Sequence, residues 1–247
     1  MENNKIQFLN TYINNITMEE TLHYIDSFIT ENKKSYIVPI NVDVVTKIEE
    51  DPYLKKIADN ASLVLVDGTP LIWISKLLKM PVKEKVSGSD LIPSVCEMAA
   101  DKGYTIFFLG GKDEVARQAK EKLEQRHTSI KVVGTYSPPL GFENDNKELE
   151  KINHTISKAS PDILVVCFGC PKQEKFIYEN INKYDAKISI CAGATIDFLA
   201  GNVKRAPQWM SNYGLEWFYR FTQEPKRLFK RYFIDDMKIF KLVMKYK

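Results

Sequence analysis

The segment DILVVCFGCPKQEKF (162–176) decides the fold class of this 247-residue chain. Its first half is an almost unbroken run of apolar and β-branched residues, typical of a strand that is covered on both faces of a parallel sheet. A glycine and then a proline follow this run, which indicates a tight junction between a strand and a helix. The same order of strand, turn and helix recurs along the chain and is typical of an open, doubly wound α/β sheet.

Six such strands are expected between residues 35 and 193. They cover 35–41, 62–66, 104–110, 130–136, 162–169 and 187–193. Helical patterns fall between them and cover 43–59, 70–79, 90–102, 113–126, 146–159 and 172–183. The first 34 residues are expected to add one strand, and a helix over 17–32, at an edge of the sheet. We therefore predict an α/β catalytic domain over residues 1–199, built on an open, mostly parallel Rossmann-like sheet with helices on both faces.

Residues 200–247 have a different composition. From residue 204 onward the chain carries 11 basic and four acidic residues, together with 11 of its 28 aromatic residues. On an ideal helix, five cationic side chains of this region share one sector, opposite a sector of aromatic and aliphatic side chains. The five are Arg227, Arg231, Lys238, Lys241 and Lys245. We predict a helical appendage that either lies in an anionic membrane interface or docks its apolar side on the body and leaves its lysines in water.

The remaining composition argues against several classes of protein. A net charge of +3 does not indicate nucleic acid as a partner. Neither a signal peptide nor an apolar run of about 20 residues is found, so a cytoplasmic location is expected. Cys167 and Cys170 form a CxxC pair, which fits a redox role or half of a zinc site. Because no second pair or histidine cluster completes a metal site, no metal and no cofactor are expected.

Ligands bind beyond the carboxyl ends of the strands in an open parallel sheet, so the residues after each strand form the candidate site. Asp67 ends the apolar strand in LVLVDGTP (63–70). Partial desolvation there raises the pKa of a carboxyl group and suits it to act as a general base. The alternative is structural, because aspartate before glycine commonly forms a turn. Asp197 has the same two interpretations, and Asp90 is expected to cap a helix.

Groups that could bind phosphate occur at the same edge. LGGK (109–112) and FGCPK (168–172) are junctions whose free helix N–H groups suit a phosphate, although glycine also serves backbone geometry there. Neither contains G-x-G-x-x-G, which disfavours a dinucleotide enzyme. The chain has no DxD triplet, so cationic side chains and helix N-termini are expected to stabilise a nucleotide leaving group. Candidate arginines for bidentate bonds to phosphate are Arg205, Arg220, Arg227 and Arg231.

Together these segments resemble the WecG/TagA/CpsF family of bacterial glycosyltransferases. The matching stretches lie in order between residues 35 and 232 and include LVLVDGTPLIW, VSGSDL, FFLGGK, SPPLGF, VVCFGCPKQEKFI, GATIDFLAGNVKRAPQWM and GLEWFYRFTQEPKRLFKRY. The resemblance implies a metal-independent, inverting transfer of an N-acetylamino sugar, with UDP-N-acetylmannosamine as the expected donor. The implied acceptor is N-acetylglucosamine on a polyprenyl diphosphate, as in the linkage unit of teichoic acid in the cell wall. It also implies an appendage that closes over the site and contacts the cytoplasmic face of the membrane.

The resemblance also implies roles for single residues. Asp67 matches the family's proposed base, and Asn41 and Gln173 match active-site residues expected to position the sugar or the acceptor. Lys85 stands where arginine is expected and Pro39 where threonine is common, which leaves the exact sugar open. The expected substrate-binding set comprises Lys85, Gly88, Asp90, Gly110, Gly111, Gly169, Pro171, Glu174, Gly193, Asp197, Arg205, Arg220, Arg227 and Arg231.

Two other classes of function fit a sheet of this kind. One is a nucleotide-dependent oxidoreductase or sugar-nucleotide epimerase, which would carry a bound cofactor. The other is a membrane-peripheral module that binds a sugar nucleotide without turning it over. The oligomeric state is also open, because the apolar side of the C-terminal helix suits a second subunit as well as a membrane.

Overall fold

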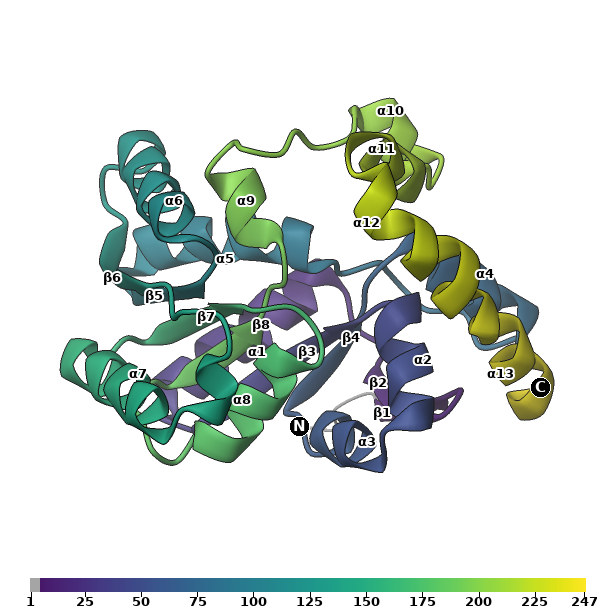
Figure 1. The fold of residues 1–247 in the computed structure, drawn as a ribbon, viewed down its shortest axis with the longest axis horizontal. Helices are drawn as coiled ribbons and strands as arrows, with labels where there is room; N and C mark the ends of the chain where they lie inside the picture. The colour runs from purple at the N-terminus through teal and green to yellow at the C-terminus, as the bar shows by residue number, and fades with distance from the viewer. Residues whose placement is uncertain (1–4) are drawn as a thin grey trace.

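A computed structural model describes residues 5–247, apart from the side chains of residues 113, 208 and 212. Its central sheet has six parallel strands in the order β4-β3-β8-β7-β5-β6 (Figure 1). The strands are β3 (Ser35–Ile40), β4 (Leu63–Val66), β5 (Thr105–Gly110), β6 (Lys131–Tyr136), β7 (Ile163–Cys167) and β8 (Ile188–Cys191). All neighbouring pairs in this sheet are parallel, which confirms the predicted α/β class.

Helices cover both faces of this sheet (Figure 1). One face carries α1 (Met18–Thr30), α5 (Gly88–Lys102), α6 (Asp113–Arg126) and α9 (Thr195–Leu199). The other carries α2 (Val42–Glu50), α3 (Pro52–Asp59), α4 (Thr69–Leu77), α7 (Asn146–Ala159) and α8 (Lys172–Asn180). Successive strand residues point to opposite faces, so Phe107 of β5 belongs to one apolar core and Phe108 to the other. Burial on both faces explains why the strands are almost wholly apolar.

Two expectations about the periphery were wrong in detail. The N-terminal residues form a separate antiparallel hairpin of β1 (Lys5–Phe8) and β2 (Thr11–Asn14), instead of one strand added to the main sheet. The hairpin lies beside the edge strand β4, whose Val64 N–H donates to the Asn14 side chain at 2.7 Å. The helix expected over 43–59 is two helices, α2 and α3, because Asp51 leaves the helical conformation and caps the second one. Pro52 favours that break, since proline disfavours a helical residue before it.

The C-terminal region is helical, as predicted. It contains α10 (Gln208–Asn212), α11 (Glu216–Gln223), α12 (Pro225–Lys230), the π-helical turn η2 (Arg231–Asp235), the 3-10 turn η3 (Asp236–Lys238) and α13 (Ile239–Tyr246). The segment from α12 to α13 is one continuous helical run that lies along α2 (Figure 1). Ile239, Leu242 and Val243 are buried and join the core on the α2 side.

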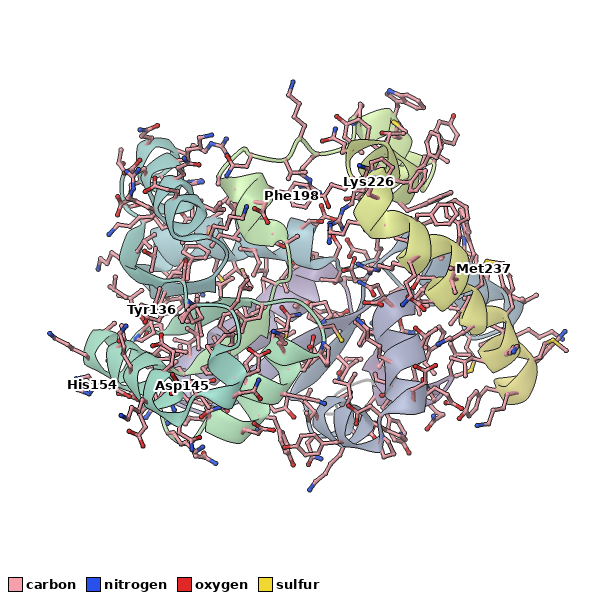
Figure 2. All side chains as sticks on the ribbon, viewed as in Figure 1. Tyr136, Asp145, His154, Phe198, Lys226 and Met237 are labelled. Carbon is pink, nitrogen blue, oxygen red and sulfur yellow. The ribbon has the colours of Figure 1, made fainter. Side chains whose placement is uncertain are left out.

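The charged side of this helical run faces the body and much of its apolar side faces outward. Lys238 pairs with Glu50 at 2.6 Å, and Lys245 pairs with Glu49 at 2.7 Å. Five apolar side chains are between 48% and 82% exposed, and Figure 2 labels one of them, Met237. They are Phe229, Phe233, Met237, Phe240 and Met244. The alternative in which this apolar side docks on the body and the lysines are left in water is therefore wrong.

Among residues 5–247, none of the helices combines the length and the apolar composition that crossing a bilayer requires.

Candidate active site

Asn41 and Asp67 lie side by side at the carboxyl ends of β3 and β4. The Asp67 N–H donates to the Ile40 carbonyl at 2.7 Å, which fixes the start of one loop against the end of the neighbouring strand. Asn41 caps α2 by accepting from the Val44 N–H at 3.2 Å. Gly68 has a φ of 103°, a left-handed conformation that only glycine adopts easily, and it turns the chain directly into α4. The predicted base is thus held at the end of a buried strand.

Asp67 is half-buried, and no hydrogen bond to its carboxyl oxygens is found among the residues that the structure describes. Burial raises the pKa of Asp67 to about 6, and the negative charge of Glu216 acts in the same direction. The charges of Lys85 and Arg220 oppose this shift in pKa. A carboxylate of this kind is ionised at neutral pH yet more basic than an ordinary aspartate, which suits proton abstraction.

A chain of ion pairs next to Asp67 joins the body to the appendage. Asp90 pairs with Arg205 through one carboxylate oxygen and with Lys85 through the other, at 3.3 Å. Lys85 also lies 3.6 Å from Glu216 of α11. Burial opposes the ionisation of Asp90, but the Ser87 hydroxyl and the Arg205 guanidinium hold its pKa below the usual value. The expectation that Asp90 caps a helix was wrong, because α5 begins two residues earlier than predicted and Ser87 is its cap. Asp90 lies in the first turn, where its carboxylate accepts from the Ser87 hydroxyl at 2.6 Å.

Arg231 reaches the same edge of the sheet from the C-terminal helical run. Its guanidinium donates to the Asn41 Oδ1 at 3.4 Å and lies 3.7 Å from the Asp43 carboxylate. Asp43 in turn pairs with Lys47 at 2.9 Å. Burial raises the pKa of the neighbouring Asp236 to about 6, against the opposing charge of Arg231. Arg231 therefore lies beside Asn41, whereas Arg220 and Arg227 line a cavity between α9 and the segment α11–α12.

Gln173 ties together the loops that follow β7 and β8. Its Oε1 accepts from the Gly169 N–H at 3.2 Å and from the Gly193 N–H at 3.0 Å. Its Nε2 donates to the Glu174 carboxyl at 2.9 Å, and both side chains are buried. Burial raises the pKa of Glu174. These bonds occupy Gln173 with the support of the site, and its expected contact with sugar or acceptor stays a prediction.

The glycines expected to bind substrate lie at the turns and close packings of this edge. Gly110, Gly111, Gly169 and Gly193 all have positive φ angles between 55° and 109°. A Cβ atom on Gly110 would lie 2.7 Å from the Cys167 carbonyl oxygen, so the close approach of β5 and β7 requires glycine there. Backbone geometry thus accounts for these glycines without a ligand.

Two other members of the expected binding set lie at helix starts near this edge. Gly88 begins α5. It is buried, and a Cβ atom placed on it would lie 3.6 Å from the Ala192 carbonyl oxygen just after β8. Pro171 caps α8. Both residues therefore help to hold the helices that border the site, and their contact with substrate stays a prediction.

A cavity of about 730 Å³ lies between α9 and the segment α11–α12. Figure 2 labels Phe198 and Lys226, which come from its two sides. Five of its side chains are cationic and two are acidic, so the cavity suits an anionic ligand such as a diphosphate. Its lining comprises Lys112, Ala194, Asp197, Phe198, Val203, Lys204, Arg220, Gln223, Glu224, Pro225, Lys226 and Arg227. This volume is within the usual range for a pocket that holds a small molecule.

Arg220 links this cavity to Asp67. Burial raises the pKa of Asp197, as does the charge of Glu224, while the charge of Arg227 opposes them. The Arg220 guanidinium lies 5.6 Å from the centre of the Phe198 ring, and its charge acts on both Asp67 and Asp197. The predicted base and the predicted phosphate-binding arginine therefore border one region, with the appendage on one side and the sheet on the other.

Two residues that bear on the site were not predicted. Glu216 was not predicted because its partner, Lys85, is far away in the sequence. Glu216 and Arg220 are four residues apart, which places both on one face of α11. Lys112 lines the cavity and directly follows the two glycines of LGGK. Among the side chains that the structure describes, no cluster of three or more histidine, cysteine or acidic residues is arranged to hold a metal ion.

Comparison with known proteins identifies the kind of protein. The sequence profile of the glycosyl transferase WecG/TagA/CpsF family matches residues 6–247. The chain belongs to this family. It is therefore a glycosyltransferase, which confirms the resemblance noted in its sequence and does not fit the oxidoreductase or epimerase alternative.

Three relatives in the family share the name N-acetylglucosaminyldiphosphoundecaprenol N-acetyl-beta-D-mannosaminyltransferase. The one from Bacillus spizizenii is 28% identical over 224 residues, which cover 91% of this chain and 83% of the relative. The one from Bacillus subtilis strain 168 is 31% identical over 205 residues, 83% of this chain and 76% of the relative. The one from Staphylococcus aureus strain MRSA252 is 26% identical over 230 residues, 91% of this chain and 87% of the relative.

Proposed function

We propose that this glycosyltransferase moves N-acetylmannosamine from its UDP form onto N-acetylglucosaminyl-diphospho-polyprenol, with inversion at the anomeric carbon and Asp67 as the general base. The names of the three relatives support the sugar and the acceptor. The observation that carries the mechanism is Asp67, half-buried at the carboxyl end of β4, whose carboxyl group has a pKa of about 6. The charge of Arg220, which lines the cationic cavity, acts on this carboxyl group, as expected for a base that works near a departing diphosphate.

The proposed reaction is a single displacement. The acceptor hydroxyl oxygen attacks the anomeric carbon while its proton passes to the Asp67 carboxylate. The bond between the anomeric carbon and the UDP oxygen breaks on the opposite face, and UDP leaves with both bonding electrons. Arg220 and Arg227 stabilise the negative charge that develops on the diphosphate, a role often filled by fixed cations in enzymes. Attack from the face opposite the leaving group inverts the configuration.

Other side chains hold the reactants in place in this proposal. Asn41 uses its Oδ1 to cap α2 and to bind Arg231, so its amide N–H groups are the atoms we assign to the sugar or acceptor. Gln173 keeps the loops after β7 and β8 at a fixed spacing. Asp197 and the cations around it contact the nucleotide. Lys85, Asp90 and Arg205 fix the appendage over the site.

We assign residues 1–199 to catalysis and residues 200–247 to closure over the site at the cytoplasmic face of the membrane. The outward apolar side chains of the C-terminal helical run support membrane contact, since exposed apolar side chains that gather on one face commonly mark an interaction surface. The acceptor in the relatives' name carries an undecaprenyl chain, which resides in a membrane. A second copy of the chain is the other partner that such a surface suits.

The test is a substrate panel. The purified protein is incubated with several UDP-sugars and a short-chain polyprenyl-diphosphate acceptor bearing N-acetylglucosamine, with and without EDTA. We expect UDP release and a disaccharide product only with UDP-N-acetylmannosamine, a β linkage in that product, and unchanged turnover in EDTA. Turnover with a different sugar would refute the donor assignment, and loss of turnover in EDTA would refute the account of the leaving group. Binding of UDP with no product from any donor would instead support a non-catalytic binding module.

A further inference from the structure

Lys85 lies next to Asp67 in the fold, but its ammonium group pairs with other carboxylates. The Val86 N–H donates to the Val66 carbonyl at 2.9 Å, which sets the residue after Lys85 against the residue before Asp67. The Lys85 ammonium nevertheless lies 3.3 Å from Asp90 and 3.6 Å from Glu216. No ion pair joins it to Asp67 among the side chains that the structure describes.

Glu216 is the part of this arrangement that comes from the appendage. It lies in the first turn of α11, and its side chain is 23% exposed, as is that of Lys85. Although burial acts the other way, the carboxylates of Asp90 and Glu216 hold the pKa of Lys85 above its usual value. Asp90 shares its charge with Arg205 as well. Glu216 is therefore the carboxylate through which the appendage holds the Lys85 ammonium.

Loss of Glu216 leaves the Lys85 ammonium with Asp90, which also pairs with Arg205, and allows it to approach Asp67. A lysine ammonium on its flexible four-carbon stem moves easily between carboxylates. A Lys85–Asp67 pair would occupy the oxygens that must accept a proton, and it would make that carboxylate a weaker base. The charged groups that act on the pKa of Asp67 are Glu216 and Arg220 of α11, Asp90 of α5, and Lys85 of the loop before α5.

We propose that Glu216 is a positioning residue for the transfer reaction: by binding Lys85 from the appendage, it keeps the Lys85 ammonium away from Asp67 and leaves that carboxylate free. This inference rests on the proposed role of Asp67 as the base. It means that docking of the appendage frees the base at the same moment that it brings Arg220 to the leaving group. The base is then ready only when the site is closed.

The experiment is an NMR titration of the Asp67 carboxyl carbon in the full-length protein labelled with ¹³C-aspartate, with the signal assigned from Asp67→Asn. In the wild type we expect a midpoint near pH 6. In Glu216→Gln, which keeps the shape of the side chain, we expect the midpoint to fall by about 1–2 pH units. The acid limb of kcat/KM should shift by the same amount, and turnover at pH 7.5 should fall by about 3–10-fold because a weaker base accepts a proton less readily.

The partner variant separates positioning from simple loss of docking. Lys85→Met alone should raise the midpoint, and adding Glu216→Gln to Lys85→Met should lower it by much less than Glu216→Gln does in the wild type, because no ammonium is left to move onto Asp67. An equal fall in both backgrounds would mean that only the charge of Glu216 itself acts, which would overturn the proposal. Glu224→Gln, the matched change on the same appendage, should leave the Asp67 titration where it is, because Glu224 acts on Asp197. An unchanged midpoint in Glu216→Gln would overturn the proposal. A midpoint that falls in Lys85→Met would also overturn it, since undocking of the appendage would then be the cause.

This titration does not depend on turnover. If Asp67→Asn keeps its activity, the role of Asp67 as base fails, and the midpoints still decide whether Glu216 controls where the Lys85 charge lies.

Discussion

Different interactions stabilise the body and attach the appendage to it. The strands that end at the site are buried along their whole length, and two apolar cores cover the faces of the sheet. The appendage adds only a few buried side chains to one of these cores, among them Ile239, Leu242 and Val243, and its other contacts with the body include several ion pairs. These pairs are Arg205–Asp90, Lys85–Glu216, Arg231–Asp43, Lys238–Glu50 and Lys245–Glu49. Because partly exposed ion pairs contribute little each, the appendage should open far more easily than the body unfolds.

This contrast matters for catalysis because each part supplies a different half of the chemistry. The body holds the predicted base at the end of a buried strand, so the packing of the sheet fixes its position. The appendage holds the arginines assigned to the leaving group on a segment that we expect to dock reversibly. Opening of the appendage would therefore leave the base in place but remove the positive charge assigned to the leaving group.

The largest effect is expected from Asp67→Asn in the body. Turnover should fall by roughly 10²–10⁴-fold, because amide nitrogen cannot accept the proton, while the affinity for UDP stays within about twofold. Initial rates of UDP release and calorimetric UDP binding measure the two quantities. Asp185→Asn is the matched control, since Asp185 is exposed at the amino-terminal edge of the sheet and should keep full activity. Near-normal turnover in Asp67→Asn would remove this residue from the mechanism.

Arg220→Ala tests the contribution of the appendage. It removes a fixed cation from the leaving group, so turnover should fall by about 10²–10³-fold. In contrast to Asp67→Asn, affinity for UDP should weaken as well, because the cavity loses part of its positive charge. Arg126→Ala, at the exposed end of α6, is the control and should behave as the wild type. If Arg220→Ala lowered turnover with UDP affinity unchanged, the assignment of Arg220 to the diphosphate would be wrong.

The outward apolar side of the C-terminal helical run should decide membrane contact. Replacing both Phe233 and Phe240 by glutamate places two charges where apolar side chains are exposed. We expect at least a tenfold loss of co-sedimentation with anionic vesicles. Sedimentation velocity without vesicles gives the oligomeric state in the same samples. Unchanged vesicle binding together with a loss of oligomers would show that this surface is a contact between subunits.

A change in salt concentration should have the smallest effect, and it compares the stability of the two regions most directly. Raising NaCl from 0.05 to 0.5 M shortens the range of electrostatic interactions to a few ångströms and should loosen the appendage. Trypsin cleavage within residues 204–247 should become several-fold faster, whereas the thermal midpoint of the body should move by only about 2 °C. Equal changes in both readouts would contradict the distinction drawn between the regions.

The sheet could be predicted because its signal is local. Runs such as DILVVCF and LVLV are apolar along their whole length, and the turn residues beside them mark where each strand ends. Asp67 could be located for the same reason, since it directly follows such a run. Pro52 also indicated the break between α2 and α3. Because the helical pattern of apolar residues continues on both sides of it, a single helix was predicted.

The contacts of the appendage could not be predicted because they join residues that are distant in the sequence. Amphipathicity showed that the C-terminal helix has a basic face and an apolar face, but not which of them meets the body. That choice depends on Glu49 and Glu50 of α2, whose carboxylates pair with Lys245 and Lys238. Glu216 was missed in the same way, since nothing in its own segment reveals Lys85 as its partner.

The pH dependence of kcat/KM tests the central claim most directly, namely that burial at the end of β4 makes Asp67 a base poised near neutrality. Only the ionised carboxylate accepts a proton, so kcat/KM should rise about tenfold per pH unit below pH 6 and level off above it. The account predicts a single acid limb with a midpoint near 6 that disappears in Asp67→Asn. A limb near pH 4, or the same limb in Asp67→Asn, would contradict it.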